Sequence, residues 1–287
     1  MTAGVLGRHA EPTRVDDLGP LVAGWPVENV SVGVTGPDRT LGVAGDPEWV
    51  TRIASVAKLL VGMTALVALE EETIELDEPA GPEGSTVRHL LAHASGLTFD
   101  GNKSIARPGR RRIYSNTGIE RFADHLAARA GMPFDDYLRL GVLEPLGMAR
   151  TELRGSPAHA VWSSVSDLLV FCRELLRPTL VSKETLADAI RPHFPDLGGV
   201  LPDIGRFDLN PWGLTFEIRD GKDPHWTGRR NSPATFGHFG GTGTFLWVDP
   251  EAGLATVALT DRDFGPWALK AWPPFSDEVL ETYAESS

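Results

Sequence analysis

Ser55 and Lys58 stand three residues apart at the start of an apolar stretch, residues 56–69. A hydroxyl becomes an effective nucleophile only when a neighbouring group takes its proton. Residues at positions i and i+3 of a helix share a face, so a helix beginning here would place the lysine amine beside the serine hydroxyl. The spacing therefore predicts a serine nucleophile with a proton carrier. The plainer alternative is an N-capping serine followed by a solvated lysine.

Two later motifs complete a possible site. Tyr114-Ser115-Asn116 follows a loop rich in Pro, Gly and Arg and precedes an amphipathic helix. His238-Phe239-Gly240 leads into Gly241-Thr242-Gly243 and a strand-like run. In this order the three motifs resemble the signature of the serine β-lactamase and penicillin-binding-protein superfamily, in its branch of class C β-lactamases, DD-peptidases and esterases. The resemblance extends from about residue 30 to about residue 260, with further landmarks at residues 86–97, 144–148 and 163–168.

The resemblance implies a role for each motif residue. Ser55 would be the nucleophile that forms an acyl-enzyme, and Lys58 would hold it and share its proton. Tyr114 would be the general base and acid, either as a phenolate whose pKa a nearby ammonium lowers or by acting through Lys58. Asn116 would hydrogen-bond Lys58 and the acyl group of the substrate. The oxyanion hole would consist of the backbone N–H groups of Ser55 and Gly241.

The third motif is where the chain departs from its relatives, and its residues are expected to bind substrate. The β-lactamases of this branch have Lys-Thr-Gly and related DD-peptidases have His-Thr-Gly, whereas this chain has His238-Phe239-Gly240. A protonated His238 would hold an anionic substrate only below its pKa. Phe239 lacks the hydroxyl that helps to bind a carboxylate, which favours neutral short-chain acyl groups. Gly240 and its neighbours would let the backbone approach the ligand closely.

The elements that must position these motifs are predicted to form an α+β fold. Hairpins are expected at residues 30–44 and 244–260, so an antiparallel sheet flanked by helices would be built from both chain ends. The resemblance implies one catalytic unit, residues 1–287, of the β-lactamase/transpeptidase-like type. Its α/β lobe would comprise about 1–78 and 207–287, and a mainly helical lobe would occupy about 79–206.

Composition limits the partners and the cellular location. The net charge of -12 argues against a nucleic-acid partner and against anchoring on anionic lipid. The single cysteine, Cys172, and the lack of a leader-like apolar segment in residues 1–26 are consistent with a cytoplasmic protein. His89 and His93 are more typical of structural histidines than of a zinc site, so we expect no metal and no cofactor. The run Arg110-Arg111-Arg112 is expected to be a solvated loop, and the oligomeric state is left open.

The leading functional prediction is a cytoplasmic serine hydrolase, an esterase or amidase that forms an acyl-enzyme on Ser55 with a small-molecule acyl substrate. The enzymatic alternative is a β-lactamase or D-amino-acid carboxypeptidase, and a less favoured one is an acyltransferase. A non-catalytic ligand-binding module would have lost a motif residue, yet Ser55, Lys58, Tyr114, Asn116 and His238 are all present.

Overall fold

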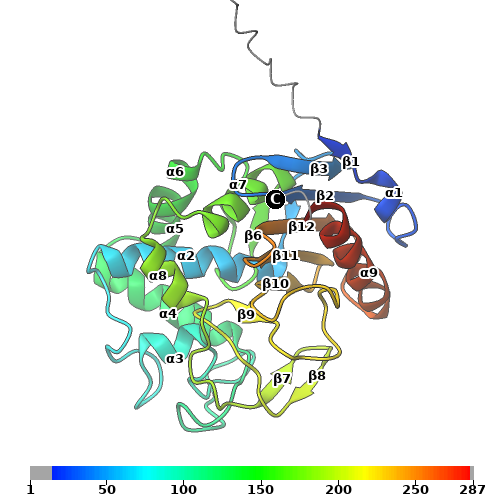
Figure 1. Cartoon of the computed structure of the whole chain (residues 1–287). Coiled ribbons are helices and arrows are strands. Elements are labelled where there is room, and N and C mark those ends of the chain that lie inside the picture. Colours follow the sequence, from blue (N-terminus) through cyan, green and yellow to red (C-terminus); the bar gives the residue numbers. More distant parts are fainter. Residues whose placement is uncertain (1–14, 285–287) are drawn as a thin grey trace, which may run out of the picture.

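The structure, a computed structural model, describes residues 15–284 and is organised around a seven-stranded sheet. Strands from both ends of the chain lie side by side in the order β1-β3-β2-β12-β11-β10-β9 (Figure 1). Their bounds are β1 (Asp16–Asp17), β2 (Val30–Thr35), β3 (Thr40–Ala44), β9 (Glu217–Ile218), β10 (Phe236–Gly240), β11 (Thr244–Asp249) and β12 (Leu254–Thr260). The sheet joins the chain ends where β12 runs antiparallel to β2.

Both predicted hairpins are confirmed, and the α+β class with them. β2 pairs with β3 and β11 pairs with β12, each antiparallel. One detail of the prediction is wrong, because β1 pairs with β3 in parallel and the sheet is therefore mixed. The two residues of β1 carry no hydrophobic alternation, so their pairing depends on tertiary contacts that the local sequence does not encode.

Helices cover both faces of the sheet. Helix α9 (Pro266–Tyr283) lies over one face and α7 (Val165–Leu176) packs against β2 and β12 on the other (Figure 1). Residues of β11 alternate between two hydrophobic clusters: Phe245 and Trp247 belong to the α9 side, whereas Leu246 and Val248 belong to the larger core on the helical side. A strand buried on both faces needs apolar residues at every position, which explains its continuous hydrophobic run.

The chain between the two hairpins is mainly helical, as predicted. It contains α2 (Ala57–Glu70), α3 (Val87–Leu91), α4 (Asn116–Ala130), α5 (Phe134–Leu138), α6 (Glu144–Leu146), α7 and α8 (Lys183–Ala189), with a 3-10 turn, η1 (Ala54–Val56), before α2 and a π-helical turn, η2 (Arg139–Leu143), before α6. Short strands form a small sheet, β4 (Thr51–Arg52), β5 (Glu152–Leu153) and β6 (Val161–Ser163), and a hairpin, β7 (Gly199–Leu201) and β8 (Gly205–Phe207). A short helix, α1 (Gly19–Val22), follows β1. The lobe boundaries near residues 79 and 206 stay a prediction.

The central helix α2 explains how a lysine near its start can be hidden from water. Its residues from Ala57 to Ala68 are all buried. A helix that is apolar all round is a core helix, as the sequence indicated. Across residues 15–284, no helix combines the length and the hydropathy that a bilayer crossing requires.

Candidate active site

Ser55 lies in the 3-10 turn that leads into α2, pressed against strand β10. Thr244 donates a hydrogen bond from Oγ1 to the carbonyl of Ile53, 2.9 Å away, which ties the turn to β11. A Cβ at Gly240 would come within 2.6 Å of that same carbonyl oxygen, so only glycine lets β10 lie this close. Ala54 has φ +45°, a left-handed conformation that costs a non-glycine residue free energy. The next residue, Ser55, is half-buried in this turn.

Lys58 contacts the serine and is completely buried. Its Nζ lies 3.2 Å from Ser55 Oγ and donates to Asn116 Oδ1 at 2.7 Å and to the Ala158 carbonyl at 2.8 Å. Burial lowers the pKa of the Lys58 ammonium to about 7, against the opposing charges of Glu120 and Asp100. Near neutral pH a large fraction of this side chain is therefore a neutral amine that can accept the serine proton.

Tyr114 lies beside Lys58 but not as a phenolate. The Lys58 Nζ is 4.8 Å from the centroid of the Tyr114 ring. Burial raises the pKa of the phenol far above its usual value, and the adjacent Ser55 hydroxyl offsets only part of that rise. The predicted lowering of the Tyr114 pKa is wrong, because burial disfavours the phenolate and also removes much of the charge from Lys58. Of the two routes left open by the sequence, the structure favours Tyr114 acting as a phenol together with Lys58.

Asn116 is placed at the head of α4 and links Lys58 to a carboxylate. The helix begins with Ser115 as its N-cap, whose Oγ accepts from the N–H of Gly118 at 2.9 Å. Asn116 accepts from Lys58 through Oδ1, as predicted, and donates through Nδ2 to Asp100 at 3.1 Å. Sequence reasoning missed Asp100 and Glu120, although Glu120 stands four residues after Asn116 and so on the same helix face.

His238 faces Tyr114 from β10 as a neutral imidazole. Its Nδ1 is 2.6 Å from the carbonyl oxygen of Phe239, so Nδ1 carries the hydrogen and Nε2 is left as an acceptor. Within the described residues that buried Nε2 has no partner. Burial, reinforced by the charge of Lys58, lowers the His238 pKa to about 3. His238 is therefore neutral near neutral pH, and its predicted part in substrate binding stays a prediction.

Three aromatic rings pack around the ring of Tyr114. Tyr114 packs against His93, Trp212 and His238, with ring centroids 4.7, 5.7 and 5.5 Å from its own. His93 accepts the backbone N–H of Ser115 through Nδ1 at 3.2 Å. His93 thus supports the backbone at the start of α4. Within residues 15–284 there is no group of three potential metal ligands.

Phe239 is packed into the core, whereas Gly241 borders open space. The Phe239 ring packs against Phe264 and Trp226, at centroid distances of 4.6 and 5.8 Å, and is 7% exposed. Its contacts are those of a core residue, so direct substrate contact by this ring stays a prediction. A Cβ at Gly241 would meet no atom within 4 Å, so the space beside its Cα is open. Its part in an oxyanion hole also stays a prediction.

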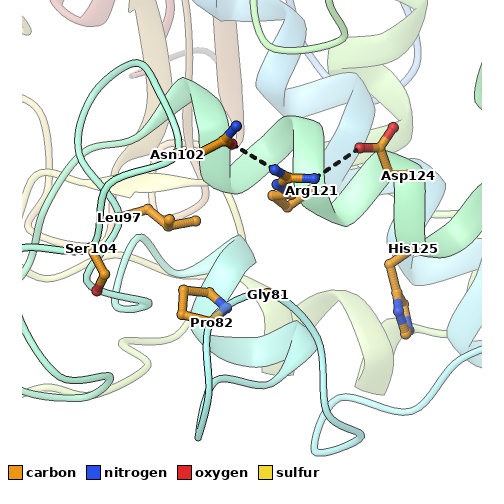
Figure 2. A pocket seen from close by; sticks show the side chains of 8 residues that line it. All are labelled: Gly81, Pro82, Leu97, Asn102, Ser104, Arg121, Asp124 and His125. Carbon is orange, nitrogen blue, oxygen red and sulfur yellow. Dashed lines mark hydrogen bonds and ion pairs between the residues drawn. The ribbon is translucent and has the colours of Figure 1, made fainter.

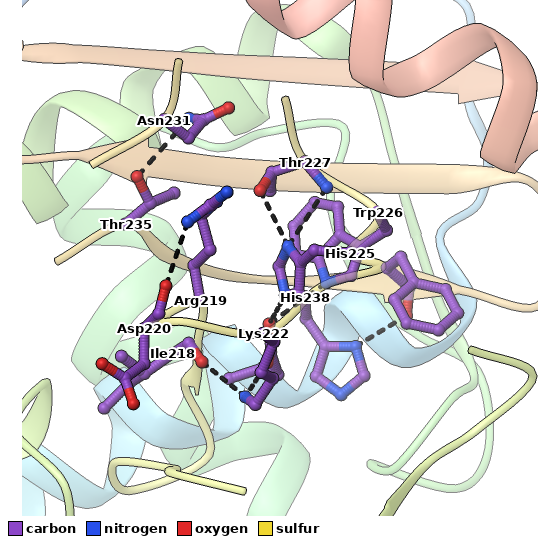
Figure 3. A network of polar contacts seen from close by, with 12 residues as sticks. Ile218, Arg219, Asp220, Lys222, His225, Trp226, Thr227, Asn231, Thr235 and His238 are labelled. Atoms are coloured by element: carbon purple, nitrogen blue, oxygen red, sulfur yellow. Dashed lines mark hydrogen bonds and ion pairs between the residues drawn. The ribbon is translucent and has the colours of Figure 1, made fainter. Parts of the chain in front are cut away.

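A buried network of charges lies behind β10, in the segment 191–230 to which the sequence assigned no role. Glu217 of β9 pairs with Lys222 and accepts hydrogen bonds from His225 Nε2 at 3.0 Å and from Trp226 Nε1 at 3.1 Å. Lys222 also donates to the Ile218 carbonyl, and His225 contacts Thr227 (Figure 3). Lys222 and His225 together lower the pKa of the Glu217 carboxyl despite its burial.

Arg112 is another residue whose place the sequence did not indicate. The run 110–112 was expected to be solvated, yet Arg112 is 2% exposed. Its guanidinium donates to four carbonyls, those of Ala92, His193, Phe194 and Asn210. Burial lowers its pKa to about 9, and the four acceptors replace the water it has lost.

Two surface pockets flank this region. One is lined by Arg121, Asp124 and His125 of α4 with residues of the 81–104 segment, and Arg121 bridges Asn102 and Asp124 across it (Figure 2). None of the motif residues lines it. A second pocket, of about 490 Å³, has Tyr114 among its lining residues and so lies next to the candidate active site.

Comparison with known proteins identifies the family. Residues 21–281 match the family model described as Beta-lactamase, and the chain belongs to that family of serine hydrolases. A solved beta-lactamase structure from Mycobacterium bovis is 51% identical in sequence and superposes with a TM-score of 0.91. The match covers 92% of this chain and 98% of that one.

Two further relatives are more distant. The D-alanyl-D-alanine-carboxypeptidase/endopeptidase AmpH of Escherichia coli (strain K12) is 26% identical over 145 residues, which span 38% of each chain. EstCE1, described as a hydrolase with promiscuous acyltransferase activity, shares the fold at 16% identity with a TM-score of 0.72, over 91% of this chain and 96% of its own.

Proposed function

We propose that the protein hydrolyses esters or amides of a small acyl group through an acyl-enzyme on Ser55. The observation that supports this most directly is the amine of Lys58, buried and with its pKa lowered to about 7, at 3.2 Å from the Ser55 hydroxyl. A nucleophile and a base at this separation meet the geometric requirement for general-base activation.

The reaction proceeds in two balanced steps. Lys58 takes the proton of Ser55 as Oγ forms a bond to the substrate carbonyl carbon, and the backbone N–H groups of Ser55 and Gly241 stabilise the developing oxyanion. The bond to the leaving group then breaks; Tyr114 donates its phenol proton to the leaving oxygen or nitrogen and takes the former Ser55 proton from Lys58, which returns to the neutral amine. Water repeats the sequence on the acyl-enzyme and releases the acid.

The neutral His238 favours ester and amide substrates over β-lactams and peptides ending in a carboxylate. With its pKa lowered to about 3, the side chain supplies no positive charge at the third motif near neutral pH. Its free Nε2 acceptor would repel a carboxylate placed there. The β-lactamase and D-amino-acid carboxypeptidase activities named for two of the relatives are therefore the alternatives, and acyl transfer to a second metabolite is a further one.

The location and partners are part of the same proposal. A buried single cysteine, Cys172, is compatible with a reducing cytoplasm, and a small-molecule acyl substrate is the only partner we propose. A non-catalytic binding module would have no use for a neutral lysine amine beside a half-buried serine.

The test is covalent labelling of the parent and of Ser55→Ala. A p-nitrophenyl alkylphosphonate should give one adduct, at Ser55, by intact-protein and peptide mass spectrometry, and Ser55→Ala should lose ester hydrolysis by several powers of ten with an unchanged melting temperature. Lys58→Met and Tyr114→Phe should each be severe and the double variant little worse than either, because groups acting as a unit are non-additive. An adduct at another serine would refute the assignment.

A further inference from the structure

The pocket beside Tyr114 is built by two segments that meet at the buried Arg112. The backbone N–H of Arg112 donates to the Gly198 carbonyl at 3.0 Å, and Arg112 bridges to Gly199. This bridge sets the segment 99–114 against the hairpin of β7 and β8 and leaves a pocket of about 490 Å³ between them. Tyr114 is one of its lining residues, which places the pocket beside the candidate active site.

The outer walls are apolar and exposed to water. Of the seven large apolar side chains that are exposed in residues 15–284, three line this one pocket: Phe99, Ile105 and Val200, at 50%, 50% and 47% exposure. Isolated exposed apolar residues need no explanation, but a concentration of them in one concavity is typical of a ligand site.

The same pocket carries cations in an acidic protein. Arg111 and Arg206 line it and are exposed, and within the described part of the chain no carboxylate lies in ion-pair contact with either guanidinium. One carboxylate, Asp203, also lines the pocket, so positive charge exceeds negative charge there although the whole chain carries -12. A local positive field of this kind attracts anions.

We propose that this pocket receives the leaving group of the substrate, an apolar alcohol or amine that carries an anionic group at its far end. The proposal rests on the proposed function, because Tyr114 and Lys58 return a proton to the leaving group, which must therefore lie on the Tyr114 side. The apolar part packs on Phe99, Ile105 and Val200, and the anion pairs with Arg111 and Arg206. The substrate class is an ester or amide of a medium-chain ω-hydroxy or ω-amino acid.

Four esters separate the elements of this proposal: the acetates ethyl acetate, hexyl acetate and 6-acetoxyhexanoate, and ethyl hexanoate, in which the long chain is moved to the acyl side. With proton release followed at constant pH, kcat/KM should rise tenfold or more from ethyl to hexyl acetate, since each buried methylene contributes up to about fourfold. Ethyl hexanoate should gain much less. 6-Acetoxyhexanoate should exceed hexyl acetate at low salt and lose that advantage at high salt.

Matched variants assign the effect to residues. Arg111→Gln and Arg206→Gln should each lower kcat/KM for 6-acetoxyhexanoate by about two- to fivefold and leave hexyl acetate unchanged, as expected for exposed ion pairs. Ile105→Ser and Val200→Ser should lower hexyl acetate and spare ethyl acetate. Arg177→Gln and Leu140→Ser make the same chemical changes at exposed positions outside the pocket and should do neither.

A failure of this proposal is distinguishable from a failure of the proposed function. Equal kcat/KM for ethyl and hexyl acetate, or an equal gain for ethyl hexanoate, would overturn the leaving-group pocket while Ser55 labelling still succeeds. If Ser55 is not labelled, calorimetry with Ser55→Ala decides the pocket alone. The variant should then bind 6-acetamidohexanoate more tightly than N-ethylacetamide, and Arg206→Gln in that background should reduce the difference by about two- to fivefold. Equal binding of the two amides overturns the proposal.

Discussion

Taking a lysine ammonium out of water costs free energy, and the side chain lowers that cost by giving up its proton. Lys58 is such a buried lysine: it donates hydrogen bonds to Asn116 and to the Ala158 carbonyl, and burial lowers its pKa to about 7. The carboxylates of Asp100 and Glu120 limit the shift. At the residue scale, the chemistry therefore depends on how completely one amine is buried and how far away its counter-charges lie.

The pH dependence of kcat/KM tests this directly. Below pH 7 the amine holds its proton and cannot accept another, so kcat/KM for a neutral ester should rise with pH and level off above the Lys58 pKa of about 7. His238 has a pKa near 3 and cannot account for that change. The rise should therefore persist at the same pH in His238→Asn. Its disappearance in that variant would mean that the histidine, and not the lysine, titrates.

At the scale of elements, the site depends on how closely β10 approaches the serine turn. Gly240 faces the carbonyl of Ile53 at a distance that no Cβ allows, whereas the next residue, Gly241, faces open space. Strand β10 also carries His238, and it pairs within the sheet with β9, which contains the buried Glu217. Glycine at 240 is thus required by the close approach of the Ile53 carbonyl, whereas no such contact requires glycine at 241. The buried charges around Glu217 support β10 through its neighbour β9.

Substituting the two glycines separates their roles. Gly240→Ala should push β10 away from Ser55 and lower kcat/KM by a hundredfold or more, because a displacement of about 1 Å costs that much in a preorganised site. Gly241→Ala adds the same methyl group where nothing lies within 4 Å, so its melting temperature should stay close to that of the parent. Equal activity and stability in the two variants would contradict the close approach.

The buried network makes a prediction about stability. Glu217→Gln leaves the Lys222 charge buried without its partner and should lower the free energy of unfolding by about 3–5 kcal/mol in chemical denaturation. The control is Glu281→Gln, which removes one partner of an exposed ion pair with Arg230 at 3.0 Å and should change stability by no more than about 1 kcal/mol. A small effect at Glu217 would show that Lys222 is not charged there.

At the scale of the whole molecule, one hydrophobic core joins the sheet to the helical region. The larger cluster includes Val257 of β12 together with Phe122 of α4 and Phe171 of α7. Segments far apart in the sequence therefore share their buried surface, and neither part keeps its core without the other.

Unfolding should reflect that shared core. Five of the eight tryptophans are buried in the cluster that includes the α9 face, so their fluorescence reports mainly on the sheet, whereas far-UV ellipticity reports mainly on the helices. The two signals should give the same denaturant midpoint because the cores are continuous. Separate midpoints would favour the two lobes, 79–206 and the remainder, as independent units.

The sequence predicted those parts of the molecule whose signals are local. Both hairpins and the central helix follow from periodicity and turn residues, whereas the contact of Asn116 with Lys58 follows from the family resemblance that the three motifs carry. The predicted lowering of the Tyr114 pKa was wrong and the low pKa of His238 was not foreseen, because both pKa values depend on burial by segments distant in the chain. Arg112 and the Glu217 network were missed for the same reason: their partners are carbonyls and side chains that only the folded chain brings together.

The pairing of β2 with β12 affects how the protein must be made. Gly33 accepts a hydrogen bond from Thr256, a residue 223 positions later. At a translation rate of about 5–20 residues per second, the first hairpin waits on the order of 10–45 s at the ribosome before its partner strand is synthesised. Through that interval β2 offers an unpaired apolar edge to other nascent chains. Yield in a recombinant host should therefore depend on chaperone supply and growth temperature, even for variants whose finished fold is stable.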